Sequence, residues 1–339
     1  MKRGHRRDDL HVQSNRKGSL LVLAAIATSA SVFAFALAAA GATPQPAPTL
    51  RFEVLATTPL KLTDIVWTGT RFFYVDNTTN RVFAADRTGA VTGLFATMPN
   101  VVEETRCVAS PARYGFPKGG LFCHSPDNRI YRISPTGEVS QFARIPEDEI
   151  SDGALAVDDV GRLGHRLVAA TGHSGNPGGS VYTIDTSGRV AKVGSYGGPG
   201  GAENVVIAPS TFGTQGGSAL LSIDADSTTG SLIAVDARGR ATTIARFSDG
   251  VNPIAVIPRR LRLTGIPQAG FYVVDTFPGT PLVAAAGQFA GQSGNVIVGS
   301  EQMGRFWLVA PTKSGFRSTR LRTNLNSPPY NLEGAIFVP

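Results

Sequence analysis

The sequence predicts an all-β protein, a β-propeller of six blades with four antiparallel strands in each. Two observations predict it: one turn motif recurs along the chain, and short apolar runs of strand length recur around each copy of it. No stretch after residue 42 keeps a helical period for three turns. Short strands between regular turn signals are typical of sandwiches, barrels and propellers, and a repeat of about 45 residues singles out the propeller.

The recurring turn opens with Asp or Ser and places a glycine three positions later. Its copies contain Gly89, Gly137, Gly188 and Gly239, which are 48, 51 and 51 residues apart. The Asp and Ser side chains can bond the turn backbone, and glycine can take a positive φ. Each copy therefore predicts a tight hairpin connection with a bulge.

The apolar runs around the turns fall into classes, and the number of members in two of these classes gives the number of blades. Opening strands are expected at 64–67, 106–109, 153–157, 204–208, 253–257 and 334–338. Second strands are expected at 72–75, 120–123, 166–169, 219–222, 271–274 and 295–298. Both classes have six members, which predicts six blades. The strand order in 276–332 does not follow from the repeat, so five or seven blades stay open.

The two ends of the propeller region complement each other. Residues 52–59 read as an outer strand with no blade of its own before it, and residues 333–339 read as an opening strand. Strands from both termini in one blade would close the ring and remove a sheet edge.

The N-terminal segment has the features of a signal peptide. Residues 1–18 are polar and basic, residues 19–42 carry no charge, and the run ends in the small residues Ala40, Gly41 and Ala42. This pattern predicts a signal peptide over 1–42, a Pro-rich spacer over 43–50 and a propeller domain over 51–339. An uncleaved anchor is the alternative, because the apolar run can span a bilayer. We expect a secreted or extracytoplasmic protein that meets the membrane only through this segment.

The net charge gives little support for an anionic partner. The whole chain has a formal charge of +7, but the leader holds six basic and two acidic residues, so the remainder carries +3. No basic stripe with interleaved aromatic residues occurs, so we expect no nucleic-acid binding. We expect a monomer whose partner is a small-molecule or glycan ligand.

The two cysteines fall on neighbouring strands of the second blade. Cys107 lies on its first strand and Cys123 on its second. An even count in an exported protein favours a disulfide, and two buried free thiols are the alternative.

Acidic and amide residues stand at the start of every opening strand. In a propeller these strands line a central channel, and ligands bind at its mouth. The residues in question are Thr63 with Asp64, Glu104, Asp152, Glu203 with Asn204, Asn252, and Glu333. Converging oxygens are the ligands of Ca²⁺ or another divalent cation, and the carboxylates would repel one another without one. The metal set we predict is Glu104, Asp152, Glu203, Asn204, Asn252 and Glu333. Plain turn chemistry of Asp, Asn and Glu is the alternative.

The repeat resembles the senescence marker protein/gluconolactonase family and the strictosidine synthase-like propellers. Glu333-Gly334 is similar to that family's Glu-Gly-Pro opening, and Asp152-Gly153 to its Pro-Asp-Gly strand entry. Asn204 or Asn252 would stand for its ligand Asn, although no Pro-Asn-Gly triplet occurs. The resemblance implies six blades and one divalent cation in the channel. It also implies hydrolysis of a lactone or ester, with Asp152 and Glu203 as the catalytic candidates.

Two other functions fit the same fold. A non-catalytic extracellular propeller could bind a glycan, a peptide or a protein partner on one face. A quinone-dependent sugar dehydrogenase suits the compartment, but no His/Arg cofactor set is evident. The absence of a Gly-x-Ser-x-Gly motif argues against an α/β-hydrolase triad.

Overall fold

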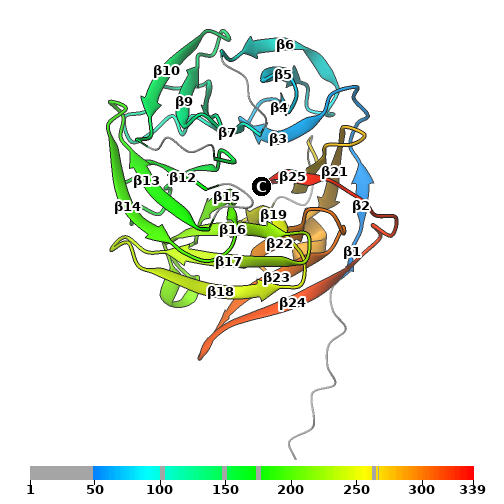
Figure 1. The fold of residues 1–339 in the computed structure, drawn as a ribbon. Coiled ribbons are helices and arrows are strands. Elements are labelled where there is room, and N and C mark those ends of the chain that lie inside the picture. Colours follow the sequence, from blue (N-terminus) through cyan, green and yellow to red (C-terminus); the bar gives the residue numbers. More distant parts are fainter. Residues whose placement is uncertain (1–48, 100–103, 147–150, 173–176, 262–264, 266) are drawn as a thin grey trace, which may run out of the picture. The chain divides into compact units, whose positions relative to one another are not determined.

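Six sheets of mainly antiparallel strands are arranged around a common axis in the computed structural model (Figure 1). The structure describes residues 49–99, 104–146, 151–172, 177–261, 265 and 267–339. These residues belong to one compact unit, and the predicted signal peptide over 1–42 lies outside them. The described part of the chain contains no helix that is long and apolar enough to cross a bilayer.

The first four sheets follow one another along the chain. In each of them the four strands follow chain order from the innermost strand to the outermost. The first sheet consists of β3 (Leu62–Trp67), β4 (Phe72–Asp76), β5 (Arg81–Ala85) and β6 (Val91–Thr97), and the second of β7 (Arg106–Ala109), β8 (Leu121–His124), β9 (Arg129–Ile133) and β10 (Val139–Arg144). The third consists of β11 (Leu155–Val157), β12 (Leu167–Ala170), β13 (Gly179–Ile184) and β14 (Val190–Tyr196), and the fourth of β15 (Gly201–Ile207), β16 (Ala219–Asp226), β17 (Thr229–Val235) and β18 (Ala241–Phe247).

The recurring turn joins the third and fourth strands of these sheets, as predicted. In its first copy the Gly89 N–H donates to the Asp86 carbonyl at 3.1 Å, and the Asp86 Oδ1 atom accepts the Thr88 N–H at 2.8 Å. Gly89 has a φ of 85°, which a residue with a Cβ rarely adopts. The repeated glycine is therefore a requirement of the turn.

In the last two sheets the strands do not follow chain order, because the chain passes from the fifth sheet to the sixth and back. The fifth sheet contains β19 (Val251–Val256), β22 (Val296–Ser300), β23 (Phe306–Thr312) and β24 (Gly315–Thr323). The two strands between β19 and β22 in the chain, β20 (Gly270–Asp275) and β21 (Thr280–Ala285), belong to the sixth sheet instead. The segment that the repeat left open thus crosses to the next blade and returns.

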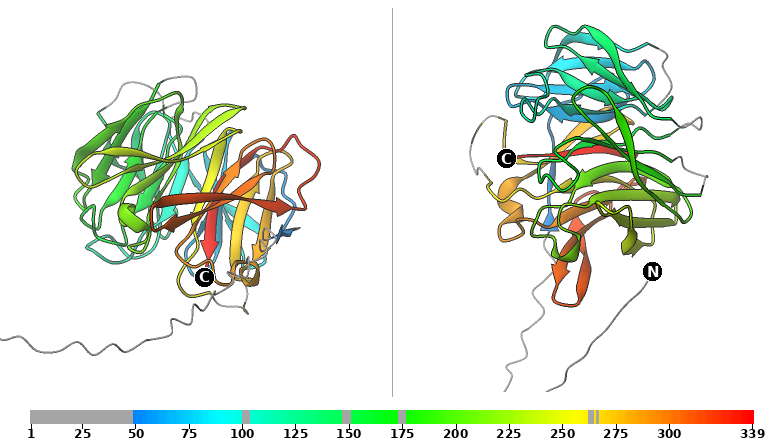
Figure 2. Two further views of the ribbon diagram at one scale, coloured as in Figure 1. Left: turned by 90° about the horizontal axis from the view of Figure 1, so that it is seen from below. Right: turned by 90° about the vertical axis from the view of Figure 1, so that its left-hand side faces the viewer.

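Strands from both termini complete the sixth sheet, which confirms the predicted closure. Its innermost strand is β25 (Leu332–Val338) and its outermost is β2 (Phe52–Val54). Figure 2 shows β25 in red beside the yellow β19, and contacts join β25 to both β19 and β3. A further strand, β1 (Thr49–Leu50), pairs in parallel with β24, so the last two residues of the predicted spacer are part of the fifth sheet.

The core lies between neighbouring sheets. Successive side chains of a strand point to opposite faces, so each strand serves two interfaces. In β4, Phe72 and Tyr74 pack toward the sixth sheet, and Phe73 and Val75 pack toward the second. Among the described residues, two short 3-10 helices, η1 (Gly213–Gln215) and η2 (Ala286–Phe289), lie in connections.

The predicted disulfide is confirmed. Cys107 on β7 and Cys123 on β8 are directly opposite in the ladder, with their Cα atoms 4.0 Å apart. The bond joins the two innermost strands of the second sheet beside the channel. A disulfide is compatible with an extracellular location.

Candidate functional site

The innermost strands are irregular where the predicted site residues stand. In β3 and β15 one residue has no partner in the ladder, Thr63 and Glu203 respectively. In β19 and β25 the extra residue falls within 252–253 and 333–334. A bulge bends its strand and changes the direction of its side chains. These four bulges bring polar side chains to the start of the channel.

In the second and third sheets, other backbone features bring the site residues to the same end of the channel. Glu104, just before β7, has a φ of 51°, and its N–H donates to Asn77 Oδ1 at 3.1 Å. Asp152 is followed by Gly153, which has a φ of 73°. A Cβ on Gly153 would lie 2.7 Å from the carbonyl oxygens of Glu104 and His124. The glycine at position 153 therefore allows the segment before β11 to lie close to the segment before β7.

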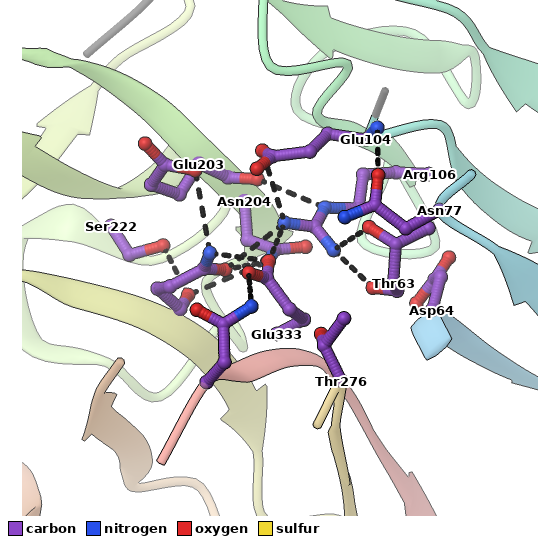
Figure 3. A network of polar contacts seen from close by, with 12 residues as sticks. Thr63, Asp64, Asn77, Glu104, Arg106, Glu203, Asn204, Ser222, Thr276 and Glu333 are labelled. Carbon is purple, nitrogen blue, oxygen red and sulfur yellow. Dashed lines mark hydrogen bonds and ion pairs between the residues drawn. The ribbon is translucent and has the colours of Figure 1, made fainter. Parts of the chain in front are cut away.

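Arg106 lies at the centre of the site (Figure 3), and the sequence analysis did not select it as a site residue. Its side chain is buried, and it comes from the first position of β7. Nη1 donates to the carbonyl and hydroxyl oxygens of Thr63, and Nε donates to the Glu203 carbonyl at 3.4 Å. Nη2 donates to Glu333 Oε2 at 2.5 Å and to Asn252 Oδ1 at 3.3 Å. One guanidinium thus connects five of the six sheets.

The acidic neighbours of Arg106 stabilise its charged form. Burial disfavours the charged guanidinium, but Glu333, Glu104 and Asp64 outweigh burial and raise the pKa of Arg106. Burial raises the pKa of Asp64 to about 6, although Arg106 opposes that rise. The site therefore contains a permanent cation that belongs to the chain.

Three of the six predicted metal ligands are engaged with one another around Arg106. Asn252 Nδ2 donates to Glu333 Oε2 at 2.7 Å and to Glu203 Oε2 at 3.3 Å. Asn204 Nδ2 donates to Asn252 Oδ1 at 2.7 Å. Asn252 and Glu333 therefore bond the guanidinium directly, and Asn204 bonds Asn252.

The other three predicted ligands converge beside this network. One carboxylate oxygen from each of Glu104, Asp152 and Glu203 lies within 4.8 Å of the other two. Asp152 and Glu203 are buried. Burial, followed by the charges of Asp152 and Glu104, raises the pKa of Glu203 well above its usual value. Oxygen donors in such an arrangement suit a hard divalent cation, while the Arg106 guanidinium approaches Glu104 only to 3.8 Å.

Two further carboxyl groups, Asp224 and Glu301, belong to the same electrostatic cluster and were not predicted. Asp224 lies on β16, and Glu301 directly follows β22. The two side chains interact, which lowers the pKa of Asp224 and raises that of Glu301. Burial raises the pKa of Asp224 to about 6, and burial with the Glu333 charge raises that of Glu301 to about 9. This pair therefore holds a proton near neutral pH.

Asp224 and Glu301 share a feature that is visible in the sequence: each lies at or just after the end of a second strand. Strands pair antiparallel, so the end of each second strand lies beside the start of an innermost strand. The ladder pairs Gly201 with Asp224 and Val251 with Ser300. A search of the ends of the second strands would have found Asp224 and the residue after Ser300, which is Glu301.

Among known proteins, similarity is found only to solved structures. No protein-family model matches the chain, and no curated protein matches it. Among solved structures, a proposed gluconolactonase is similar with 14% sequence identity and a TM-score of 0.43, covering 86% of this chain and 82% of the other. A protein from Lactobacillus plantarum is similar with 14% identity and a TM-score of 0.44, covering 85% of this chain and 90% of the other.

The chain is a six-bladed β-propeller. The fold that the resemblance implied is confirmed by the six sheets, and the chemistry of the site depends on the residues described above. The carboxyl cluster and Arg106 are the two features that a function must explain.

Proposed function

We propose that this propeller is exported and binds one divalent cation, Ca²⁺ or another, through Glu104, Asp152 and Glu203. The observation that carries the proposal is the approach of these three carboxylates to within 4.8 Å of one another. Like charges at such distances raise one another's pKa, and a bound cation removes that repulsion. The disulfide and the leader over 1–42 support export, since disulfides persist in oxidising compartments.

The reaction we propose beside the cation is hydrolysis of a lactone or an ester. A divalent cation in such a site polarises a carbonyl oxygen. Asp152 and Glu203 are the residues that would accept a proton from the attacking water. General bases work best when their pKa lies near the operating pH. Burial and the neighbouring carboxylates raise the pKa of Glu203 in the metal-free protein, and a bound cation would oppose that rise.

The Asp224–Glu301 pair is our candidate source of a proton in the same cluster. The pKa of Glu301, about 9, keeps its carboxyl group protonated near neutral pH. Its charge state also affects Glu203, because the ionised Glu301 raises the Glu203 pKa. Glu301 is therefore our candidate for the group that returns a proton to the leaving alcohol.

A non-catalytic binding propeller is the second candidate, and Arg106 favours it. Its guanidinium occupies the axis and engages Asn252 and Glu333. A glycan, peptide or protein partner could then use the cation and the carboxylates as contacts without being cleaved. The same site would bind metal in both functions, so turnover separates them.

The test compares thermal unfolding and turnover with and without metal. Protein treated with a chelator should gain stability when Ca²⁺ or Mg²⁺ is added, by about 2.7 kcal/mol at a hundredfold excess over Kd. Asp152→Asn should abolish this gain, whereas Asp226→Asn, which changes an exposed carboxylate on β16, should keep it.

The substrates for the turnover assay are phenyl acetate and simple γ- and δ-lactones. Metal-dependent hydrolysis supports the enzyme, and a metal-induced gain in stability without hydrolysis supports the binding protein. If neither metal changes the unfolding midpoint, the cation site is wrong.

A further inference from the structure

A cavity of about 450 Å³ lies within the channel, and Arg106 is part of its lining. All six innermost strands contribute to its wall, through residues such as Ile65, Val108, Leu155, Val206, Ile254 and Ile336. These residues follow the cluster residues along their strands, and Glu104, Asp152 and Glu203 are not part of the lining. The cavity is therefore distinct from the proposed cation site.

Arg106 lines the cavity and also bonds the site residues Asn252 and Glu333. Five hydrogen bonds engage its guanidinium, as many as the group has N–H donors. The side chain is buried and connects five sheets, so it cannot move aside without breaking this network. A molecule in the cavity therefore meets a fixed group at the end where Arg106 lies, which we call the inner end of the cavity.

The wall of the cavity is mainly apolar. Its side chains are mostly aliphatic, and Trp67 and Phe337 add aromatic surface. Several of them, including Val108, Val157 and Val256, keep part of their surface accessible even though they belong to the innermost strands. A concave, largely apolar space of this volume is typical of small-molecule sites.

The inner end offers hydrogen-bond acceptors. Its polar side chains are Asp64, Arg106 and Asn204, and the N–H donors of Arg106 are engaged. The lining contains one more acidic residue, Asp159, which pairs with Arg113 at 2.5 Å. The Asn204 amide group donates to Asn252, which leaves its oxygen to accept. The Asp64 oxygens accept the N–H groups of Ile65 and Cys107 and retain further lone pairs.

We propose that this cavity binds a small, neutral, largely apolar molecule with one hydrogen-bond donor, such as an aromatic or aliphatic alcohol or a diarylamine. The donor group bonds the oxygens of Asp64 and Asn204, and the apolar body packs against Trp67, Val157 and Val256. An anionic head group is excluded, because the inner end presents oxygen acceptors and would bury a second negative charge beside Asp64. The proposal does not depend on metal binding at the carboxylate cluster.

Two probes with the same ring system test the proposal. N-phenyl-1-naphthylamine is neutral and carries one N–H donor, and 8-anilinonaphthalene-1-sulfonate adds a sulfonate to it. We expect the neutral probe to bind saturably at one site, and at least tenfold more tightly than the sulfonate. Equal affinity for the two probes, or fluorescence that does not saturate, would overturn the proposal.

Trp67 reports whether the probe sits in the cavity. The chain has two tryptophans, and Trp307 packs against Phe247 on another sheet. Energy transfer from Trp67 to the bound probe should be lost in Trp67→Phe while most of the binding remains. Unchanged transfer in that variant would place the probe elsewhere.

A cavity-filling substitution provides the second test. Val256→Phe adds a ring to the wall and should weaken binding of the neutral probe at least tenfold. Leu94→Phe makes a similar addition at a side chain that is 56% exposed on β6, and it should leave the affinity unchanged. Thermal unfolding confirms that both variants are folded, and Val157→Leu replaces Val256→Phe if the latter is not. Unchanged affinity in the folded cavity variant would contradict the proposal.

Discussion

The Nη2 atom of Arg106 lies 2.5 Å from the Oε2 atom of Glu333, and both side chains are buried at the axis of the propeller. Arg106 belongs to the second sheet, whereas Glu333 belongs to the sixth, which both chain termini complete. Removing two charges from water is costly, and that cost is offset only when further hydrogen bonds satisfy them. Thr63 and Asn252 provide such bonds, so the pair links ring closure to the arrangement of the site.

Arg106→Met should destabilise the protein by about 3–5 kcal/mol, because it leaves the Glu333 carboxylate buried without its partner. Urea unfolding followed by circular dichroism measures this change. Arg317→Met, at an exposed position of β24, should change stability by less than about 0.5 kcal/mol. A cost for Arg106→Met no larger than that of the control would show that the pair does not support the fold.

The double variant Arg106→Met/Glu333→Gln should be more stable than Arg106→Met alone. It removes the uncompensated charge and keeps a side chain of similar shape. The two changes are therefore non-additive, and a double-mutant cycle in urea measures the coupling. Additive losses would mean that Arg106 and Glu333 act independently.

Replacing the disulfide by Cys107→Ala/Cys123→Ala should cost about 3 kcal/mol, as expected for a loop of this length. The bond spans a sequence separation of 16 residues. The same unfolding assay measures the loss. In the parent protein, thiol reagents should detect no free thiol after unfolding until a reductant is added, and two reactive thiols before reduction would rule the bond out.

Without divalent cations, the free energy of unfolding should fall as the pH rises. A carboxyl group whose pKa is higher in the folded protein binds more protons there than in the unfolded chain, so each rise in pH favours unfolding. For Asp64 and Asp224 this interval runs from 3.8 to about 6, and for Glu301 from 4.5 to about 9.

Glu301→Gln should therefore reduce the decline across about pH 4.5 to 9 and leave in place the contribution of Asp64 and Asp224 between 3.8 and about 6. Urea unfolding in the presence of a chelator, repeated across this range, provides the measurement. Glu53→Gln, at an exposed position of β2, is the matched control and should keep the parent's slope. If Glu301→Gln shows the same slope as the parent, Glu301 is not the group that titrates there.

Local pattern was sufficient to predict most of the fold. Each strand class has its own signature in the chain, so the innermost and second strands fall where the repeat places them. The exchange between the fifth and sixth sheets was not predictable, because the pattern identifies a strand without identifying its partner. β20 reads as a second strand in either sheet, and only its pairing with β25 assigns it to the sixth.

The candidate site was predictable only in part, for a similar reason. Glu104, Asp152 and Glu203 stand at equivalent positions in the repeat, so their convergence follows from the ring. Arg106 reads as an ordinary first residue of a strand, and its role depends on five sheets meeting at its guanidinium. The disulfide was predictable because Cys107 and Cys123 fall on adjacent strands of one blade.

Calorimetric titration of Ca²⁺ into chelator-treated protein tests the central claim most directly. We expect one binding site per chain, loss of binding in Asp152→Asn, and retention in the Asp226→Asn control. Binding that survives Asp152→Asn unchanged, or the absence of any Ca²⁺ or Mg²⁺ binding to the parent protein, would contradict the proposal that Glu104, Asp152 and Glu203 hold a cation.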